Sequence, residues 1–527
     1  MIYHCEDHTC NYWDEGEKLP ERCPQCGRKL LRANEADMTG DDWTALGNTL
    51  WDAEASDKKR MVDCFRKAAY LGSAWGVCNL GICMEQGNGV EADPVQAFWL
   101  YQQAVEMGSL NAVCCLGVCY QYGIGTAPDA KQAAELYCKA AEYGSPRGQM
   151  LLARAFHDGI GVEADAAEAV HWVRAAAYQR YGEGMHRLGV CYAYGDGVEQ
   201  NWEHAVHWFR EAAESGVSVA MTDLGYCYEK GCGVEQSWDQ AFSWYRRGAE
   251  CGDPVSMSNL GLCYKRGYGV EQNWQEAIKW YEQGAQCGNL QSMHNLACCY
   301  ERGEGVKQNM TEAIRWYTAA AEGGNADDMY NLGWLYDHGE GVEQDMKKAI
   351  CWYERAAEQN HPAAMNSLGE CYAMGRGVPR DLETAMEWYR RAAELGEAMA
   401  DYNMGWHLEQ AGKLSEAYAH YRKAADGNDD SAWWALGRFY ENGVVVAQDG
   451  KEARRCYETG EKLGSVKCKM RLARCKLLGI GGRRAKKAGL DLCRQALELA
   501  KESSEKEDYG YEAEMNLLRR TIAENES

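Results

Sequence analysis

Four cysteines near the N-terminus have the residue type and spacing of a metal site. Cys5, Cys10, Cys23 and Cys26 follow the pattern C-x4-C-x12-C-x2-C, and the CPQCG run is its more specific half. Four thiolates fit tetrahedral zinc, and so short a segment needs a cross-link to fold. We therefore expect one structural zinc ion. His8 could replace Cys5 or Cys10 as a ligand, unbound thiols are the alternative, and iron ranks below zinc because a second C-x-x-C is missing.

A second set of residues recurs along the chain and could bind a partner. Asparagine occurs at Asn259, Asn295 and Asn331, which are 36 residues apart, and again at Asn403. A row of amides can hydrogen-bond an extended peptide backbone whatever its sequence, because each amide has both donors and an acceptor. Asparagines that are solvated or bonded to neighbouring helices are the alternative. The flanking candidates for partner contacts are His294, Tyr330, Asn366, Tyr402, Trp334, Trp406, Arg266 and Arg302.

The spacing of the other recurring cysteines favours a role in packing over a role in disulfide bonding, redox chemistry or metal binding. Eight of the 25 cysteines occupy equivalent places, namely Cys83, Cys119, Cys191, Cys227, Cys263, Cys299, Cys371 and Cys475. If they lie on neighbouring helices roughly 8 to 10 Å apart, a ladder of disulfides is disfavoured, since a disulfide needs Cα atoms within about 7 Å. We expect small, partly buried side chains, with a redox or metal role as the alternative.

The sequence lacks several common catalytic motifs. The chain has no H-E-x-x-H, no Walker loop and no G-x-S-x-G. Its repeated Gly-x-Gly-Val loops lack the preceding strand, the third glycine and the lysine of a phosphate loop. Their glycines are better placed to end one helix and turn the chain. We therefore predict that the protein is not an enzyme.

Composition and charge narrow the partners. The formal net charge of −23 opposes general binding to nucleic acid and anionic lipid. No apolar run approaches the roughly 20 residues of a membrane helix, and the first residues lack a secretory signal, so we expect a cytoplasmic protein. Residues 451–501 differ, with 15 Lys or Arg against 5 Asp or Glu. This basic region is interpreted as a solvated cap that also pairs with nearby acidic surface, or alternatively as a docking site for an acidic partner.

The elements that position these residues follow from an internal repeat. A small residue, usually the glycine of a Leu-Gly pair, recurs along the chain. Ten of the twelve intervals between its successive occurrences are 36 residues long. These reference residues are Gly47, Gly81, Gly117, Ala153, Gly189, Gly225, Gly261, Ala297, Gly333, Gly369, Gly405, Gly437 and Ala473. Around each, apolar residues at helical spacing form two segments separated by a glycine-rich turn. A lone hairpin cannot bury its apolar face, so we predict an all-α array of about a dozen stacked helix-turn-helix units.

The repeat resembles a known family. Segments such as NLGLCYKRGYGVEQNWQEAIKWYEQGAQCG from Asn259 and SLGECYAMGRGVPRDLETAMEWYRRAAELG from Ser367 are similar to Sel-one-like repeats, the SLR branch of the tetratricopeptide superfamily. The resemblance implies a right-handed superhelix, or solenoid, and scaffolding or adaptor work without enzymatic chemistry. Related tetratricopeptide grooves use asparagine in this way to hold peptides. The first residues resemble a zinc ribbon or a rubredoxin-like knuckle.

These observations predict three regions and a ranked set of functions. Residues 1–35 form the zinc module, 36–478 the repeat array, and 479–527 two capping helices. The leading hypothesis is a scaffold that binds a peptide or client protein on the concave face of the array. The alternatives are a nucleic-acid-associated regulator that uses the zinc module and the basic region, and a metal or thiol redox protein. The oligomeric state is not indicated.

Overall fold

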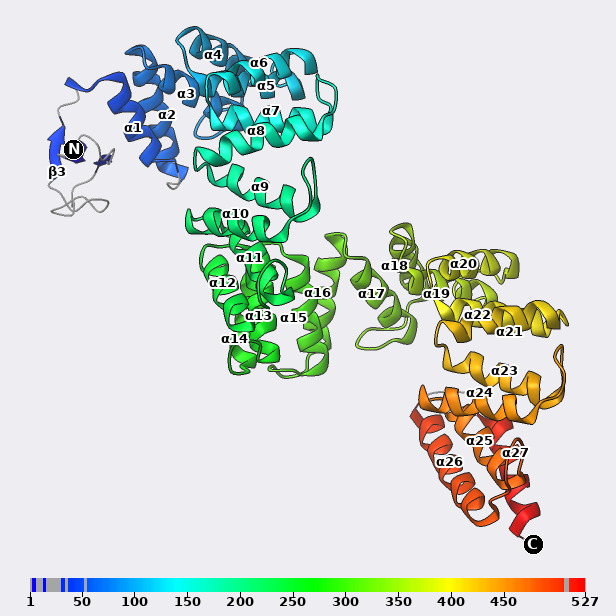
Figure 1. Cartoon of the computed structure of the whole chain (residues 1–527). Coiled ribbons are helices and arrows are strands. Elements are labelled where there is room, and N and C mark those ends of the chain that lie inside the picture. Colours follow the sequence, from blue (N-terminus) through cyan, green and yellow to red (C-terminus); the bar gives the residue numbers. More distant parts are fainter. Residues whose placement is uncertain are drawn as a thin grey trace. The chain divides into compact units, whose positions relative to one another are not determined.

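The computed structural model describes residues 2–5, 13–15, 30–33, 37–51, 55–506 and 511–526. It divides into two compact units, Met1–Cys287 and Gly288–Ser527, and each is described by itself. Throughout both units the described residues from 40 onward form helices joined by short turns (Figure 1).

Three short strands precede the helices in the first unit. They are β1 (Ile2–Cys5), β2 (Trp13–Glu15) and β3 (Leu30–Ala33). They form an antiparallel sheet in the order β2-β1-β3. The register pairs His4 with Trp13 and Cys5 with Leu30, so the end of β1 lies beside the starts of both other strands.

Seven helical hairpins follow in the first unit. Their helices are α1 (Gly40–Thr49), α2 (Ala55–Tyr70), α3 (Ala74–Gln86), α4 (Pro94–Glu106), α5 (Leu110–Tyr122), α6 (Ala130–Glu142), α7 (Pro146–Asp158), α8 (Ala166–Tyr178), α9 (Gly182–Tyr194), α10 (Trp202–Glu214), α11 (Ser218–Lys230), α12 (Trp238–Glu250), α13 (Pro254–Arg266) and α14 (Trp274–Gln286). Odd-numbered helices are the first helices of their hairpins and carry the reference residues.

The second unit continues the same pattern. Its helices are α15 (Leu290–Arg302), α16 (Met310–Glu322), α17 (Ala326–His338), α18 (Met346–Glu358), α19 (Pro362–Met374), α20 (Leu382–Glu394), α21 (Ala398–Gln410), α22 (Leu414–Asp426), α23 (Asp430–Asn442), α24 (Gly450–Lys462), α25 (Val466–Leu478), α26 (Lys486–Lys506) and α27 (Glu512–Glu526). The all-α array of tandem hairpins predicted from the sequence is thus confirmed. No helix among the described residues is long and apolar enough to span a membrane.

The turns follow from capping chemistry. Helix α13 ends at Gly267, which takes the left-handed conformation with φ 73° and donates its N–H to the carbonyl of Cys263. The next loop glycine, Gly269, lies against the preceding hairpin, where a Cβ would be 2.3 Å from the carbonyl oxygen of Trp238. The side chain of Asn273 then caps α14. The prediction that these glycines end helices and turn the chain is confirmed.

The core explains why the reference residue is small. In the hairpin of α13 and α14, a Cβ on Gly261 would come within 2.5 Å of the ring of Tyr281, twenty residues later. Most repeats bury an equivalent tyrosine, and its hydroxyl donates a hydrogen bond to an acceptor four residues after the reference residue. These pairs are Tyr101–Glu85, Tyr137–Gln121, Tyr245–Glu229, Tyr317–Glu301, Tyr353–Asp337, Tyr421–Glu409 and Tyr457–Glu441. Each ring therefore locks the two helices of its own hairpin together.

The recurring cysteines are part of this core. All eight members of the series are buried, and the thiols of Cys119 and Cys227, for example, have no exposed surface. Burial raises the pKa of both thiols to about 12. They are buried more completely than the partly buried position predicted from the sequence.

Candidate functional site

The predicted partner-binding residues lie on the first helices of consecutive hairpins. In the first unit Asn259 is partly buried and Arg266 is exposed on α13. In the second unit Asn295, Asn331 and Asn403 are also partly buried, on α15, α17 and α21. These side chains are thus only partly accessible, and their contacts within the protein decide what they can bind.

At α19 and α21 the predicted amides bind each other. The Nδ2 of Asn403 donates to Oδ1 of Asn366 at 3.0 Å and to Oε1 of Glu370 at 3.2 Å, and Asn366 donates to the same carboxylate. Burial raises the pKa of Glu370. Asn79 makes a similar contact with Asn48 across α3 and α1. At these places the amides join neighbouring repeats, which was the alternative interpretation of the sequence.

The predicted aromatic residues remain partly open. Trp334 and Trp406 expose 36% and 38% of their surface. The ring of Trp334 stacks on His338, with centroids 4.3 Å apart. Tyr330 stacks on His361 at 5.0 Å, and Tyr402 lies 5.6 Å from Tyr421. The two tryptophans are the stronger contact candidates, since large aromatic side chains anchor many recognition surfaces.

The imidazole of His294 is engaged inside the second unit. Its Nδ1 lies 2.7 Å from Oδ1 of Asp328, a fully buried carboxylate on α17. Its Nε2 lies 3.6 Å from the sulfur of Cys298, one turn later on α15. The sequence analysis assigned His294 to partner selectivity, and the structure places it in a polar cluster with a cysteine.

A cavity of about 360 Å³ opens in the first unit, in the hairpin of α7 and α8. This hairpin has Val173 where most repeats have the buried tyrosine, and His157 where most have its acceptor. The apolar wall of the cavity is formed by Met150, Ala153, Ala169, Val170 and Val173. The cavity therefore occupies the place of a ring that this repeat lacks.

The rim of the cavity is polar. His157 contacts Asp158 at 2.7 Å through Nδ1 and Asp196 at 3.3 Å through Nε2. Arg154 pairs with Asp158, and Arg187 pairs with Asp196. A hydrogen bond from His157 lowers the pKa of Asp158. With Glu183 also on the rim, three carboxylates face two guanidinium groups, so the rim has acceptors available for a hydrogen-bond donor.

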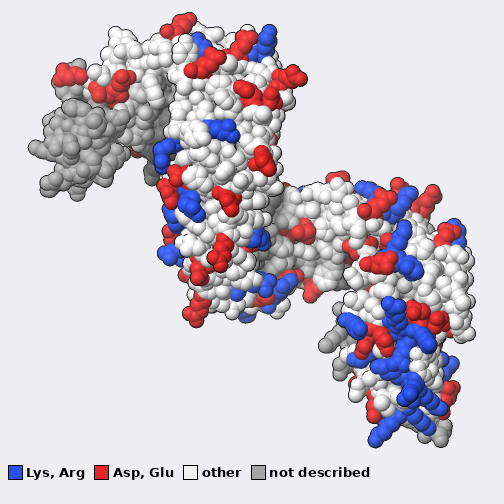
Figure 2. All heavy atoms as spheres, in the orientation of Figure 1, with Lys and Arg blue, Asp and Glu red and all other residues white. Residues whose placement is uncertain are grey.

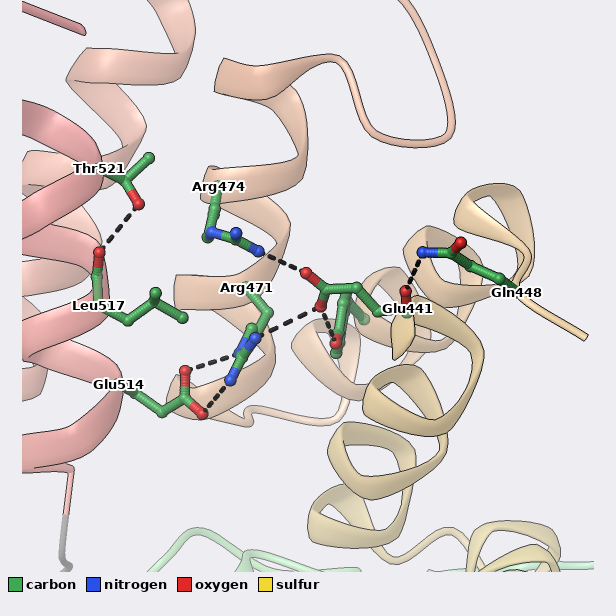
Figure 3. A network of polar contacts seen from close by, with 8 residues as sticks. Glu441, Gln448, Arg471, Arg474, Glu514, Leu517 and Thr521 are labelled. Carbon is green, nitrogen blue, oxygen red and sulfur yellow. Dashed lines mark hydrogen bonds and ion pairs between the residues drawn. The ribbon is translucent and has the colours of Figure 1, made fainter. Parts of the chain in front are cut away.

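The basic region gathers at the C-terminal helices, where Lys and Arg cover much of the visible face (Figure 2). Part of this charge is used internally. Arg471 of α25 lies between Glu514 of α27, at 2.7 Å, and Glu441 of α23, at 3.4 Å, and Arg474 also binds Glu441 (Figure 3). Both carboxylate partners, Glu441 and Glu514, are mostly buried, so these contacts fasten the last helices. They support the interpretation as a cap that pairs with acidic surface.

The predicted zinc site falls largely outside the described residues. Cys10, Cys23 and Cys26 lie there, as do His8 and the side chain of Cys5, although the backbone of Cys5 ends β1. Within residues 37–51, 57–501 and 511–525, no group of three or more His, Cys, Asp or Glu side chains could hold a metal ion.

Sequence reasoning missed the cavity and the repeated tyrosine-to-acceptor pair. The signal was present in the aligned repeats, because Val173 and His157 depart together from the tyrosine and acceptor at equivalent places. The cluster of His294, Cys298 and Asp328 was also missed. Its histidine and cysteine are four residues apart, but Asp328 belongs to the next repeat and only stacking brings it close.

Comparisons with known proteins agree with this architecture. The family model "Sel1 repeat" matches eleven segments: 76–109, 112–145, 146–181, 182–217, 218–253, 254–289, 290–325, 326–361, 362–397, 398–429 and 432–465. The chain is similar to the solved structure of c5321, described as a protective antigen present in uropathogenic Escherichia coli strains displaying an SLR fold. The identity is 29%, over 88% of this chain and 94% of that chain, with a TM-score of 0.56.

A Sel1 repeat protein from Oxalobacter formigenes is 31% identical over 46% of this chain and 96% of that chain, with a TM-score of 0.42. A search of curated proteins finds no match. The eleven matched segments cover most of the described helices. The chain therefore belongs to the Sel1 repeat family.

Proposed function

We propose that this protein is a non-enzymatic scaffold whose first helices bind an extended segment of a partner protein. Sel1 repeat proteins are generally protein-interaction scaffolds. Partly open amides such as Asn259 and Asn331 can take backbone hydrogen bonds, and the exposed rings of Trp334 and Trp406 offer apolar contact. In the second unit the predicted contacts lie on the consecutive first helices α15, α17, α19 and α21, which suits a ligand that runs along them.

The cavity in the α7–α8 hairpin is the observation that carries this proposal. We propose that it receives a tyrosine side chain of the partner. In most other repeats the equivalent space holds a tyrosine ring, and in several of them its hydroxyl donates to an acceptor, as in Tyr245 and Tyr317. Here the ring is missing, the wall is apolar, and Asp158 and Asp196 are acceptors at the rim. A tyrosine from the partner would restore both interactions.

The side-chain analogue p-cresol tests this assignment directly. Ligand-observed NMR on the full chain should show p-cresol binding with a Kd on the order of 1 mM, and weaker binding of toluene, which lacks the hydroxyl donor. Val173→Tyr should abolish binding because the new ring fills the cavity. The matched control Val219→Tyr adds a tyrosine at an exposed site on α11 and should leave binding unchanged. Equal binding of toluene, or no binding at all, would contradict the assignment.

The same variants test the scaffold function with real partners. Proteins captured by the full chain from native cells should be lost with Val173→Tyr and retained with Val219→Tyr. Alanine at Asn259, or at Asn295 and Asn331 together, should weaken capture if the amides hold the backbone. Capture that survives all of these changes would place the binding site elsewhere on the molecule.

We also propose one structural zinc ion at the N-terminus. The backbone supports it, because the end of β1 at Cys5 lies beside the starts of β2 and β3. Cys10 belongs to the connection that joins β1 to β2, and Cys26 precedes the start of β3 by four residues. Metal analysis of the purified chain should give one zinc per molecule, lost in Cys23→Ser/Cys26→Ser. An iron chromophore or a metal-free native protein would contradict this.

A further inference from the structure

Four side chains on three helices of the second unit form a cluster around one sulfur. Cys298 and His294 lie one turn apart on α15, with Sγ and Nε2 3.6 Å apart. The other ring nitrogen of His294 is 2.7 Å from Asp328 in the first turn of α17. The hydroxyl of Tyr317, on α16, lies 3.4 Å from the same sulfur. The order sulfur, imidazole, carboxylate is the arrangement that activates a thiol nucleophile.

Burial fixes the roles within this cluster. Asp328 has no exposed surface, and its Oδ2 has no hydrogen-bond partner among the described residues, so its charge acts mainly on His294. The hydrogen bond to Asp328, with that to Cys298, raises the pKa of His294 to about 10. A histidine with such a partner is a cation at neutral pH.

The sulfur responds to that cation. Burial raises the pKa of the Cys298 thiol, but the hydrogen bond from His294 and the contact with the hydroxyl of Tyr317 outweigh it, and the net direction is down. Glu301, which accepts a hydrogen bond from Tyr317, is the carboxylate that opposes this change. The cluster therefore favours a thiolate paired with an imidazolium.

Cys298 is also reachable. It directly follows the reference residue Ala297, at the position that Trp334 occupies in the next repeat, and it is partly exposed. Its neighbour Cys299 is buried. The activated sulfur therefore lies on the same side of the first helices as the predicted partner contacts.

We propose that Cys298 is a nucleophilic thiolate that exchanges with disulfides and reacts with other soft electrophiles. In the exchange, the sulfur of Cys298 attacks one sulfur of R–S–S–R, a new S–S bond forms as the old one breaks, and R–S⁻ leaves. His294 is placed to give its proton to the departing thiolate. Attack by a second thiol on the mixed disulfide reverses the reaction. No external oxidant is needed, because the incoming disulfide is itself the oxidant.

The surroundings favour this chemistry over acyl transfer. Cys298 lies in the interior of α15, where backbone N–H groups are used by the helix. Acyl transfer needs free donors for an oxyanion, whereas displacement at sulfur needs only a thiolate and an open approach.

Alkylation rates in the intact full chain test the proposal without any substitution. Iodoacetamide labelling at pH 6.5, followed by mass spectrometry of the cysteine peptides, compares Cys298 with the exposed Cys251, Cys287 and Cys351. An ordinary thiol is about 1% thiolate at this pH, and a lowered pKa raises that fraction but weakens the nucleophile, so we expect Cys298 to react about tenfold faster. A rate no greater than that of the three exposed cysteines would overturn the proposal.

Variants separate activation from simple exposure. His294→Gln should move the midpoint of the pH–rate profile of Cys298 upward by a unit or more, toward about 8.5, and Asp328→Asn should move it in the same direction. Glutathione disulfide should form a mixed disulfide at Cys298 in the native chain and none in Cys298→Ser. An unchanged pH profile in a folded His294→Gln variant, or a mixed disulfide only at other cysteines, would overturn it. These outcomes are independent of p-cresol binding in the first unit.

Discussion

Two repeats share the same departure at the reference residue and differ in what surrounds it. Ala153 in α7 and Ala297 in α15 both stand where most repeats have glycine. The first repeat then has Val173 in place of the buried ring and contains the cavity. The second keeps Tyr317, which is 2% exposed, at the position equivalent to Val173. Alanine at the reference residue is thus compatible with the ring, and loss of the ring opens the cavity.

The polar residues around the two positions follow from this difference. With Tyr317 present, its hydroxyl lies between Glu301 and Cys298, and the sulfur of Cys298 belongs to the cluster with His294. With Val173 in place of the ring, His157 turns to the carboxylates at the cavity rim. The ring in the second helix therefore distinguishes a repeat suited to receive a side chain from one whose space is filled, and His294 and Cys298, which replace Met150 and Arg154, add the reactive thiol.

The largest expected effect comes from removing the ring that distinguishes the two repeats. Tyr317→Val makes the second repeat resemble the first and should lower the free energy of unfolding by about 3 kcal/mol, because a buried aromatic side chain is replaced by a cavity. Urea unfolding of the full chain measures the loss, and hydrogen exchange should locate it in α15 and α16. Tyr317→Phe is the matched control, and should cost only about 1 kcal/mol for the lost hydroxyl contacts. Equal losses in the two variants would contradict a packing role for the ring.

The next effect concerns the charges held by the second repeat. In the native chain, the raised pKa of His294 and the lowered pKa of Cys298 change the number of bound protons in opposite directions, so their effects offset each other between the unfolded pKa values of about 6.5 and 8.5. Cys298→Ser removes the sulfur. In this variant the contribution of His294 to the free energy of unfolding is fully present below the unfolded pKa of the imidazole. It is lost as the pH rises toward the folded pKa.

The free energy of unfolding of Cys298→Ser, relative to the native chain, should therefore fall from pH 6.5 to 8.5 with a slope of up to 1.4 kcal/mol per pH unit, by the linkage relation. Urea unfolding of both proteins across this range provides the measurement. If the free energies of unfolding of the two proteins depend on pH in the same way, His294 and Cys298 are not an ion pair. The second repeat would then differ from the first only in its buried ring.

Much of the fold could be predicted from the sequence, because each repeat presents the same physical problem. Gly267 and Gly269 must be glycines for the turn and for close approach to the preceding hairpin. Gly261 must be small for the ring of Tyr281. A 36-residue period with such residues predicts helical hairpins that stack, and the structure confirms this.

The site was harder to predict, because it depends on contacts between repeats and on departures from the pattern. The amide row looked uniform, yet Asn403 bonds Asn366 whereas Asn331 keeps an open edge. Periodicity gives the face of a helix but not which neighbour a polar group meets. Asp328 meets His294 only through the packing of α17 on α15, and the cavity comes from a residue that is smaller than its counterparts, not from a motif.

The smallest expected effect comes from giving the first repeat the buried ring of the second. Val173→Tyr/His157→Glu gives the first repeat the ring and acceptor that Tyr317 and Glu301 supply in the second. Since Ala297 accommodates a tyrosine, Ala153 should do so too, and filling the cavity should raise the free energy of unfolding by about 1 kcal/mol. Urea unfolding measures the gain, with Val219→Tyr as the control that adds a tyrosine outside the core. A loss of 1 to 3 kcal/mol, as overpacking gives, would show that the wall has already closed around Val173. A gain would show instead that the chain forgoes stability at this hairpin, as expected where a surface is kept open for a partner.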